Sequence, residues 1–236
     1  MVFFPFSEAP REKSLPPAAH SAGFAAPEFA AVRELFDSFL AGDPGYSAQL
    51  AVYRDGVRVL KLSGGPGLGP GDITGTYSCS KGAAAFVIAL LVQDGLLDLD
   101  RTVSSYWPEF AAHGKGRLTV RQALSHQAGL PGVAGGFALD EFTAPEAAAR
   151  LAAAAPLWRP GTAFGYHALT IGILMEELCR RTAGTSLQEL FDARIRRPFG
   201  VDFFLGLPED QEPRYRDVLY AEDPADRGWI RSAWTG

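Results

Sequence analysis

The sequence predicts an α+β fold, with a β-hairpin near the amino terminus and a mostly helical body after it. The first observation is the Asp55-Gly56 pair between two runs rich in strand-forming residues (47–63), which is the strongest short-range hairpin signal. The second is the recurrence of apolar residues at helical spacing in several segments after residue 77. The composition, 47% hydrophobic and 21% charged, is typical of globular proteins and excludes a disordered or fibrous chain.

The amino-terminal part should contain an irregular arm, one helix and the hairpin. Residues 1–27 carry five prolines and no periodic pattern, so we expect an irregular arm before a single domain over residues 28–236. Apolar residues recur at helical spacing in residues 28–41, and Gly42 supplies a stop. The hairpin that follows is the only pair of strands that the sequence predicts.

The helical body should begin with a segment that is almost entirely apolar and ends at Gly95. Because this segment is apolar on all sides, we expect a buried helix. Ser186 and Glu189 stand in the relation of a capping box, which predicts a helix start there. The other segments with helical or helix-and-loop patterns are 118–126, 144–154, 168–184 and 186–200. From Leu207 onward the sequence is polar and interrupted by proline, with no further element expected.

Several classes of function are excluded by composition. The net charge is −5 and no basic run is present, so we expect neither nucleic-acid nor membrane binding. The longest apolar run, residues 83–92, is too short to span a bilayer. No His, Cys or carboxylate set has metal-ligand spacing, and no metal or other cofactor is expected. Since no basic residue precedes the first apolar stretch, we expect a cytoplasmic protein.

The segment Ser78-Cys79-Ser80-Lys81 is an S-x-x-K box. Residues three apart share one face of a helix, so Lys81 could take the proton of the Ser78 hydroxyl, a weak nucleophile without such a neighbour. The alternative is a helix-starting serine followed by a solvated lysine. Lys81 at the head of an apolar helix favours the catalytic interpretation. We expect the cysteines, Cys79 and Cys179, to be buried and free.

Three stretches, in order, resemble the serine β-lactamase and penicillin-binding protein superfamily. Its first catalytic box is similar to YSCSKGAAAFVIALLVQDGLLDLDRTVSSYWPEF (77–110). The segment after its nucleophile helix is similar to LTVRQALSHQAGLPG (118–132), and its second-box region to WRPGTAFGYHALTIGILMEELCRRTAGTSLQELFDARIRRPFGV (158–201). The match covers about residues 47–206 and is closest to class C-like enzymes and β-lactamase-related esterases. It implies an antiparallel sheet flanked by a helical region, the β-lactamase/transpeptidase-like fold.

The resemblance also implies roles for individual residues. Ser78 would be the acyl-accepting nucleophile, Lys81 its proton partner, and Tyr166 the second-box tyrosine that acts as base or proton shuttle. The Ser78 backbone N–H would be one oxyanion-hole donor. Tyr77 and His167 are candidate substrate contacts, with packing as the open alternative for each. His126 follows Ser125, but adjacent side chains diverge, so we expect a structural histidine there.

The sequence departs from the family pattern at two places. β-Lactamases commonly have Tyr-x-Asn in the second box, whereas this chain has Tyr166-His167-Ala168. Ala168 would lie at the substrate but cannot bond a substrate amide, which favours esters. The third box of the family lies on a late strand, and the one similar tripeptide here is Trp234-Thr235-Gly236. We therefore expect a domain truncated at its carboxyl end, with the C-terminal strands missing.

These observations predict a serine hydrolase that forms an acyl-enzyme on a small carboxylic ester. One alternative is a β-lactamase or D-alanyl-D-alanine peptidase, which would act on an amide. The other is a catalytically inactive binding module of the same fold. The sequence does not indicate the oligomeric state.

Overall fold

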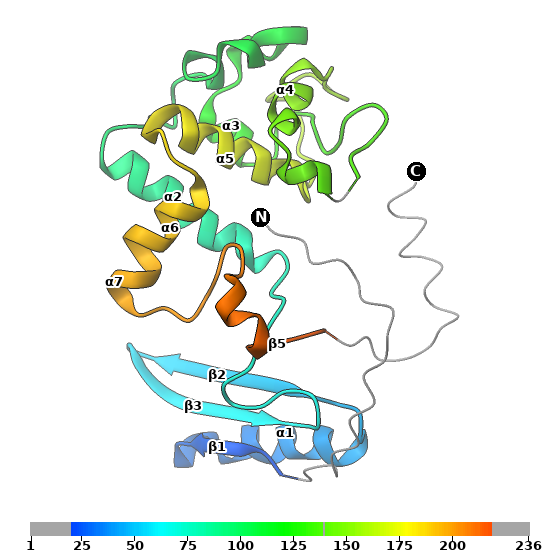
Figure 1. Ribbon diagram of the computed structural model, residues 1–236, viewed down its shortest axis with the longest axis vertical. Coiled ribbons are helices and arrows are strands. Elements are labelled where there is room, and N and C mark those ends of the chain that lie inside the picture. Colours follow the sequence, from blue (N-terminus) through cyan, green and yellow to red (C-terminus); the bar gives the residue numbers. More distant parts are fainter. Residues whose placement is uncertain (1–19, 139, 219–236) are drawn as a thin grey trace. The chain divides into compact units, whose positions relative to one another are not determined.

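The computed structural model describes residues 20–138 and 140–218 of the protein (Figure 1). These residues form two compact units: a sheet unit, residues 20–75 and 209–218, and a helical unit, residues 76–208. The boundary after Gly75 lies inside the region expected to be a single domain. The predicted α+β class is confirmed, since one unit holds an antiparallel sheet and the other is built from helices.

The sheet unit contains the predicted hairpin, formed by β2 (Ala48–Arg54) and β3 (Val57–Gly64). Asp55 and Gly56 both have positive φ, 51° and 77°, as a two-residue hairpin turn requires. A third strand, β1 (Ala22–Ala25), pairs with the other edge of β3, which gives the strand order β1-β3-β2.

Strand β1 lies in the segment expected to be an irregular arm, and with it the hairpin is not the only strand pairing. The four residues Ala-Gly-Phe-Ala are too few to show an alternating pattern. Gly23 makes the close pairing possible, because its φ is +111° and a Cβ there would lie 2.0 Å from the Lys61 carbonyl oxygen. The expectation that residues 1–19 are irregular lies outside the described residues.

Helix α1 (Ala30–Gly42) packs on the sheet, and it ends at the predicted glycine. Phe36 and Leu40 are buried in a small core with Leu60 and Leu62 of β3. A second, parallel pair consists of β4 (Ile73–Thr74) and β5 (Tyr215–Arg216), and it was not predicted. Each of these strands has two residues, which is too short for a sequence pattern.

The helical unit contains a helix in each predicted segment. They are α2 (Cys79–Gln93), α3 (Val120–Leu124), α4 (Glu146–Ala153), α5 (Thr170–Ala183), α6 (Leu187–Phe191) and α7 (Arg197–Phe199). The capping box is present: the Ser186 hydroxyl accepts from the Glu189 N–H. The single helix expected over residues 186–200 is instead α6 and α7, joined by a π-helical turn at Asp192–Arg196. The turns at Val103–Ser105, Pro108–Arg117 and Asp140–Thr143 are 3-10.

Helix α2 packs against α5 and α6 within one large core. Its buried residues are Ala84, Val87, Ile88 and Leu91. Phe86, however, is 68% exposed, so α2 is buried on one side and not on all sides as expected. An apolar composition shows that burial would be favourable, but it does not say how much of the helix other elements cover.

A buried lysine ties two segments of the helical unit together. The Lys115 ammonium donates to the carbonyl oxygens of Ala112 (2.8 Å) and Ala154 (2.6 Å), and it lies 5.4 Å from the centre of the Phe110 ring. Loss of hydration on burial lowers the pKa of this ammonium. Ala154 caps the carboxyl end of α4, and the segment after it contains Trp158. The Trp158 ring lies next to Gly165, the residue before Tyr166.

We expect Lys115→Met to lower the free energy of unfolding by about 1–3 kcal/mol, because the partly buried carbonyl groups of Ala112 and Ala154 lose their charged donor. Chemical denaturation measures this change. The matched control is Arg117→Met, which replaces an exposed cation in the same turn and should change stability by less than about 0.5 kcal/mol. Equal effects of the two substitutions would mean that the carbonyl contacts of Lys115 contribute nothing.

Candidate active site

Ser78 stands immediately before α2, and its side chain is exposed. The preceding residue, Tyr77, has a φ of 45°, an uncommon backbone conformation for a residue with a large side chain. A serine at this position usually caps the helix with its hydroxyl, but Ser78 makes no such side-chain hydrogen bond. Its hydroxyl is directed to two other side chains instead.

The first partner is Lys81, one helical turn along α2. Its ammonium nitrogen lies 3.2 Å from the Ser78 Oγ. The same nitrogen lies 5.2 Å from the centre of the Tyr166 ring, so the cation also faces the aromatic side chain. The i, i+3 spacing of the S-x-x-K box thus places both residues on one face of the helix, as predicted.

The second partner is Tyr166, which precedes α5 and is separated from Ser78 by 88 positions. A hydrogen bond of 2.9 Å joins the Tyr166 hydroxyl to the Ser78 Oγ. The bond to Ser78 lowers the pKa of the Tyr166 phenol, and Lys81 lowers it further, against a smaller opposing effect of burial. The arrangement therefore stabilises the deprotonated phenol beside the serine hydroxyl.

The three candidate substrate contacts lie in different surroundings. Tyr77 is 53% exposed beside Ser78, and Ala168 is partly buried. His167 is fully buried: its Nε2 accepts from the Leu130 N–H (2.9 Å), and its Nδ1 lies 2.6 Å from the Gly165 carbonyl oxygen. Both ring nitrogens are thus engaged with backbone, which favours the packing alternative for His167. Burial also lowers its pKa, so the neutral ring is favoured.

One residue that the sequence suggested to be only structural lies against this site. Hydrogen bonds connect His126, at the end of α3, to the backbone of Gly165 and His167, on either side of Tyr166. The only sequence signal was a histidine after a short helical segment. Nothing in the sequence links it to a tyrosine so far along the chain.

The two cysteines differ in environment. Cys179 is buried and free, as expected, and burial raises the pKa of its thiol to about 12. Cys79 is exposed, contrary to the expectation that it faces the core. As the first residue of α2, Cys79 lies on a turn that is only partly covered by the core.

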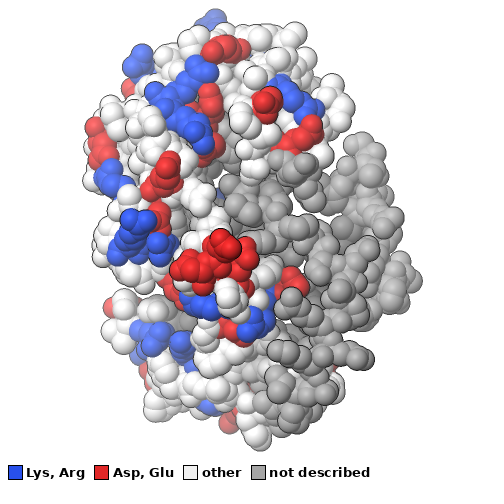
Figure 2. Space-filling view, viewed as in Figure 1, with Lys and Arg blue, Asp and Glu red and all other residues white. Residues whose placement is uncertain are grey.

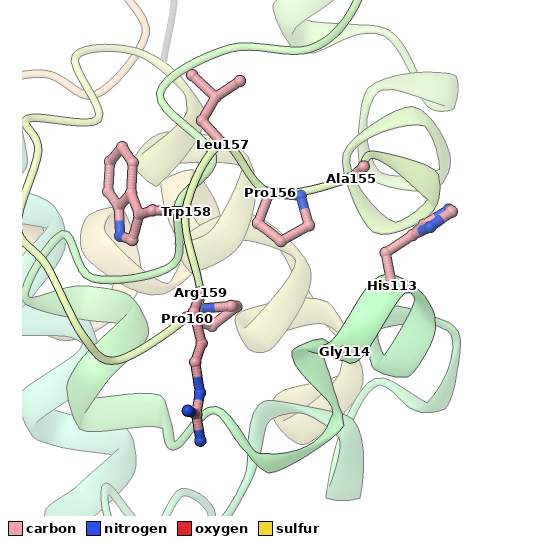
Figure 3. A pocket seen from close by; sticks show the side chains of 8 residues that line it. All are labelled: His113, Gly114, Ala155, Pro156, Leu157, Trp158, Arg159 and Pro160. Atoms are coloured by element: carbon pink, nitrogen blue, oxygen red, sulfur yellow. The ribbon is translucent and has the colours of Figure 1, made fainter.

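A shallow surface pocket in the helical unit is formed by His113, Gly114 and residues 155–160 (Figure 3). Ser78, Lys81 and Tyr166 do not line it. Trp158 lies next to both places: a Cβ on Gly165 would lie 2.5 Å from its ring, so a side chain at the residue before Tyr166 would displace that ring. Among residues 20–138 and 140–218, no cluster of three metal-ligating side chains is found.

Basic and acidic side chains lie next to each other on the face shown in Figure 2. The ion pairs of the helical unit include Arg121 with Asp100, Arg181 with Glu109, and Arg194 with Asp94. This mixed surface agrees with the absence of a basic run in the sequence. None of the helices in the described part of the chain has the length and apolar character needed to cross a bilayer.

The family model for beta-lactamase matches residues 32–236. A protein of Mycobacterium tuberculosis named esterase/beta-lactamase LipL is 37% identical over 212 residues, which are 86% of this chain and 49% of that protein. The solved structure of EstA from Arthrobacter nitroguajacolicus is 58% identical, with a TM-score of 0.82, over 87% of this chain and 55% of EstA. A family VIII carboxylesterase is 36% identical, with a TM-score of 0.80, over 85% of this chain and 57% of that one. The chain thus spans about half the length of these relatives, and it belongs to the beta-lactamase family.

Proposed function

We propose that this chain carries the nucleophile of a serine hydrolase that cleaves small carboxylic esters through an acyl-enzyme. The observation that carries the proposal is the position of the Ser78 Oγ, which is exposed and within hydrogen-bond reach of both Lys81 and Tyr166. A nucleophile, a proton acceptor and a cation that stabilises the acceptor's charge are the parts that acyl transfer needs. The names of two relatives, esterase/beta-lactamase and carboxylesterase, support the same reaction class.

The reaction follows from this arrangement. The Ser78 Oγ attacks the ester carbonyl carbon while its proton moves to Tyr166, whose deprotonated form Lys81 stabilises. The bond between the carbonyl carbon and the alcohol oxygen then breaks, and the alcohol leaves with the proton from Tyr166. Water attacks the acyl-enzyme and gives a proton to Tyr166. The carboxylic acid departs as Ser78 recovers its hydrogen.

The start of α2 supplies a donor for the negative charge that develops on the carbonyl oxygen. Backbone N–H groups at the beginning of a helix have no acceptor within the helix, and the helix dipole is positive at that end. We assign the Ser78 N–H to this role. Such donors act in the transition state, where charge accumulates, more than on the bound substrate.

Ala168 supports esters over β-lactams as the substrate class. Its methyl group can neither donate to nor accept from the acylamino group of a β-lactam, whereas an ester has no such group. We expect an active preparation of the protein to hydrolyse p-nitrophenyl acetate with a kcat/KM about 10- to 100-fold above that for nitrocefin. This range corresponds to the cost of one unpaired polar group, about 1–3 kcal/mol.

Ala168→Asn tests this assignment, because it restores an amide at the second box. We expect it to raise kcat/KM for nitrocefin relative to the ester. The matched control is Ala163→Asn, which places the same side chain on an exposed residue of the same loop and should leave the ratio unchanged. Equal specificity constants for the two substrates in the unsubstituted protein would contradict the ester preference.

The cytoplasmic location expected from the sequence stays a prediction. Fractionation of the source cells, followed by detection of the protein in each fraction, measures it directly.

A further inference from the structure

His126 holds the backbone on both sides of Tyr166. Its carbonyl oxygen accepts from the Gly165 N–H at 3.1 Å, and its ring nitrogen Nδ1 accepts from the His167 N–H at 3.0 Å. The backbone N–H groups of the two residues that flank Tyr166 therefore both donate to His126. Each bond restricts the rotation of a peptide plane next to Tyr166. Together they limit the position and direction of the Cα–Cβ bond of Tyr166.

The His126 ring also lies against the tyrosine ring itself. The ring centres of His126 and Tyr166 are 5.0 Å apart. The Phe164 ring contacts the His126 ring edge-on, with ring centres 5.7 Å apart. The Tyr166 side chain is half exposed, so the core does not fix it. His126 thus supplies a side wall for the phenol in addition to the two backbone bonds.

The backbone of His126 adopts a conformation that is uncommon for residues other than glycine. Its φ is 63°, in the left-handed region, and it directly follows Ser125, the residue that caps the carboxyl end of α3. This conformation is unfavourable for most side chains but common for Asn, Asp and His among non-glycine residues. In this conformation the carbonyl group and the ring of His126 both accept hydrogen bonds from the loop that carries Tyr166. These bonds hold the strained backbone of His126 in place.

We propose that His126 is a positioning residue, which holds the Tyr166 hydroxyl at the Ser78 Oγ through the bond from the His167 N–H to its Nδ1. The inference rests on the proposed function, because it assigns a role in that reaction. His126 does not touch the reacting atoms. It acts through the loop of Tyr166, and a misplacement of about 1 Å in a reacting group can cost on the order of 100-fold in rate.

The hydrogen bond from the His167 N–H to His126 depends on pH. Nδ1 accepts only in the neutral ring, so protonation of His126 removes the bond to His167. The titratable groups that face His126 are Lys81 from α2 and the side chains of Tyr166 and His167 from the loop. Burial lowers the pKa of His126 and the Lys81 charge lowers it further, so the bond persists at neutral pH and is lost as the pH falls below that lowered pKa.

Two substitutions separate the acceptor from the ring. His126→Asn keeps an acceptor oxygen at the distance of Nδ1 and tolerates the left-handed backbone. His126→Phe keeps a flat ring beside Tyr166 but has no acceptor. We would measure kcat and KM for p-nitrophenyl acetate, per active site titrated with a fluorophosphonate, together with the melting temperature and the pH profile of each variant.

We expect His126→Phe to lose about 10- to 100-fold in kcat per titrated site with little change in KM, and His126→Asn to stay within about fivefold. The part of the acid limb of the kcat profile that reflects protonation of His126 should disappear in His126→Asn, since its acceptor does not titrate, while the part that reflects Tyr166 should remain. A purely structural role would lower the melting temperature and the number of active sites, but not kcat per site.

Two results would overturn the proposal while leaving the proposed function intact. One is full kcat per site in His126→Phe, and the other is an unshifted acid limb in His126→Asn together with a loss as large as that of Phe. If the unsubstituted protein hydrolyses no ester and is not labelled by the fluorophosphonate, the proposed function fails, and this inference fails with it.

Discussion

Ser78→Ala should abolish ester hydrolysis, with a loss of kcat on the order of 10⁶-fold, the size seen when a catalytic serine is removed elsewhere. The substitution removes the atom that forms the acyl bond. It should not unfold the protein, because the Ser78 hydroxyl does not cap α2 and its partners among the described residues are Lys81 and Tyr166 of the proposed site. The measurements are p-nitrophenyl acetate turnover, covalent labelling by a fluorophosphonate, and the melting temperature.

The matched control is Ser80→Ala, two residues along the same helix start. Ser80 lies outside the hydrogen bonds that join Ser78, Lys81 and Tyr166, so the variant should keep activity within a few-fold. Labelling that maps to Ser80 or Ser125 would show that Ser78 is not the nucleophile. A burst of alcohol equal to the enzyme concentration, lost in Ser78→Ala, would distinguish an acyl-enzyme from an inactive binding module.

Lys81→Met should lower kcat by about 10²- to 10⁴-fold, the usual contribution of a group that assists proton transfer. Methionine keeps an apolar stem of similar length and removes the ammonium. The loss has two physical sources: the 3.2 Å contact with the Ser78 Oγ disappears, and so does the charge 5.2 Å from the Tyr166 ring.

The pH profile of Lys81→Met identifies the second source. Lys81 lowers the pKa of Tyr166, so its removal raises that pKa. Activity that depends on deprotonated Tyr166 rises as the pH rises through the phenol pKa, and we therefore expect this limb to move to higher pH in the variant. A variant that keeps more than about a third of the activity would remove Lys81 from the mechanism. An unshifted limb would mean that Lys81 acts on Ser78 alone.

The parts of the site that are close in sequence were predictable from the sequence. Ser78 and Lys81 are three residues apart, and helical geometry alone places them together. Tyr166 was found only through the family resemblance, because a separation of 88 residues is not encoded by any local period. The hairpin turn and the capping box at Ser186 were also local, since each depends on a few adjacent residues.

Other features depended on contacts that no local pattern reports. Strand β1 forms because Gly23 lets the chain lie against Lys61, so its signal is a missing side chain at one position. Lys115 resembles a surface lysine in sequence, yet its charge is satisfied by carbonyl groups 3 and 39 residues away. The exposure of Phe86 likewise reflects how many elements cover α2, which its apolar composition does not state.

The sequence by itself determined the fold class, the helix that carries Ser78 and Lys81, and, through its resemblance, the tyrosine that completes the group. Tertiary structure alone decided how that tyrosine is held: His126 is bonded to the chain on both sides of Tyr166, and His167 is buried with both ring nitrogens engaged. The physical reason is that local periodicity reports which face of an element is apolar or reactive. The partner of a hydrogen bond between distant segments is fixed only when the packed core brings those segments together.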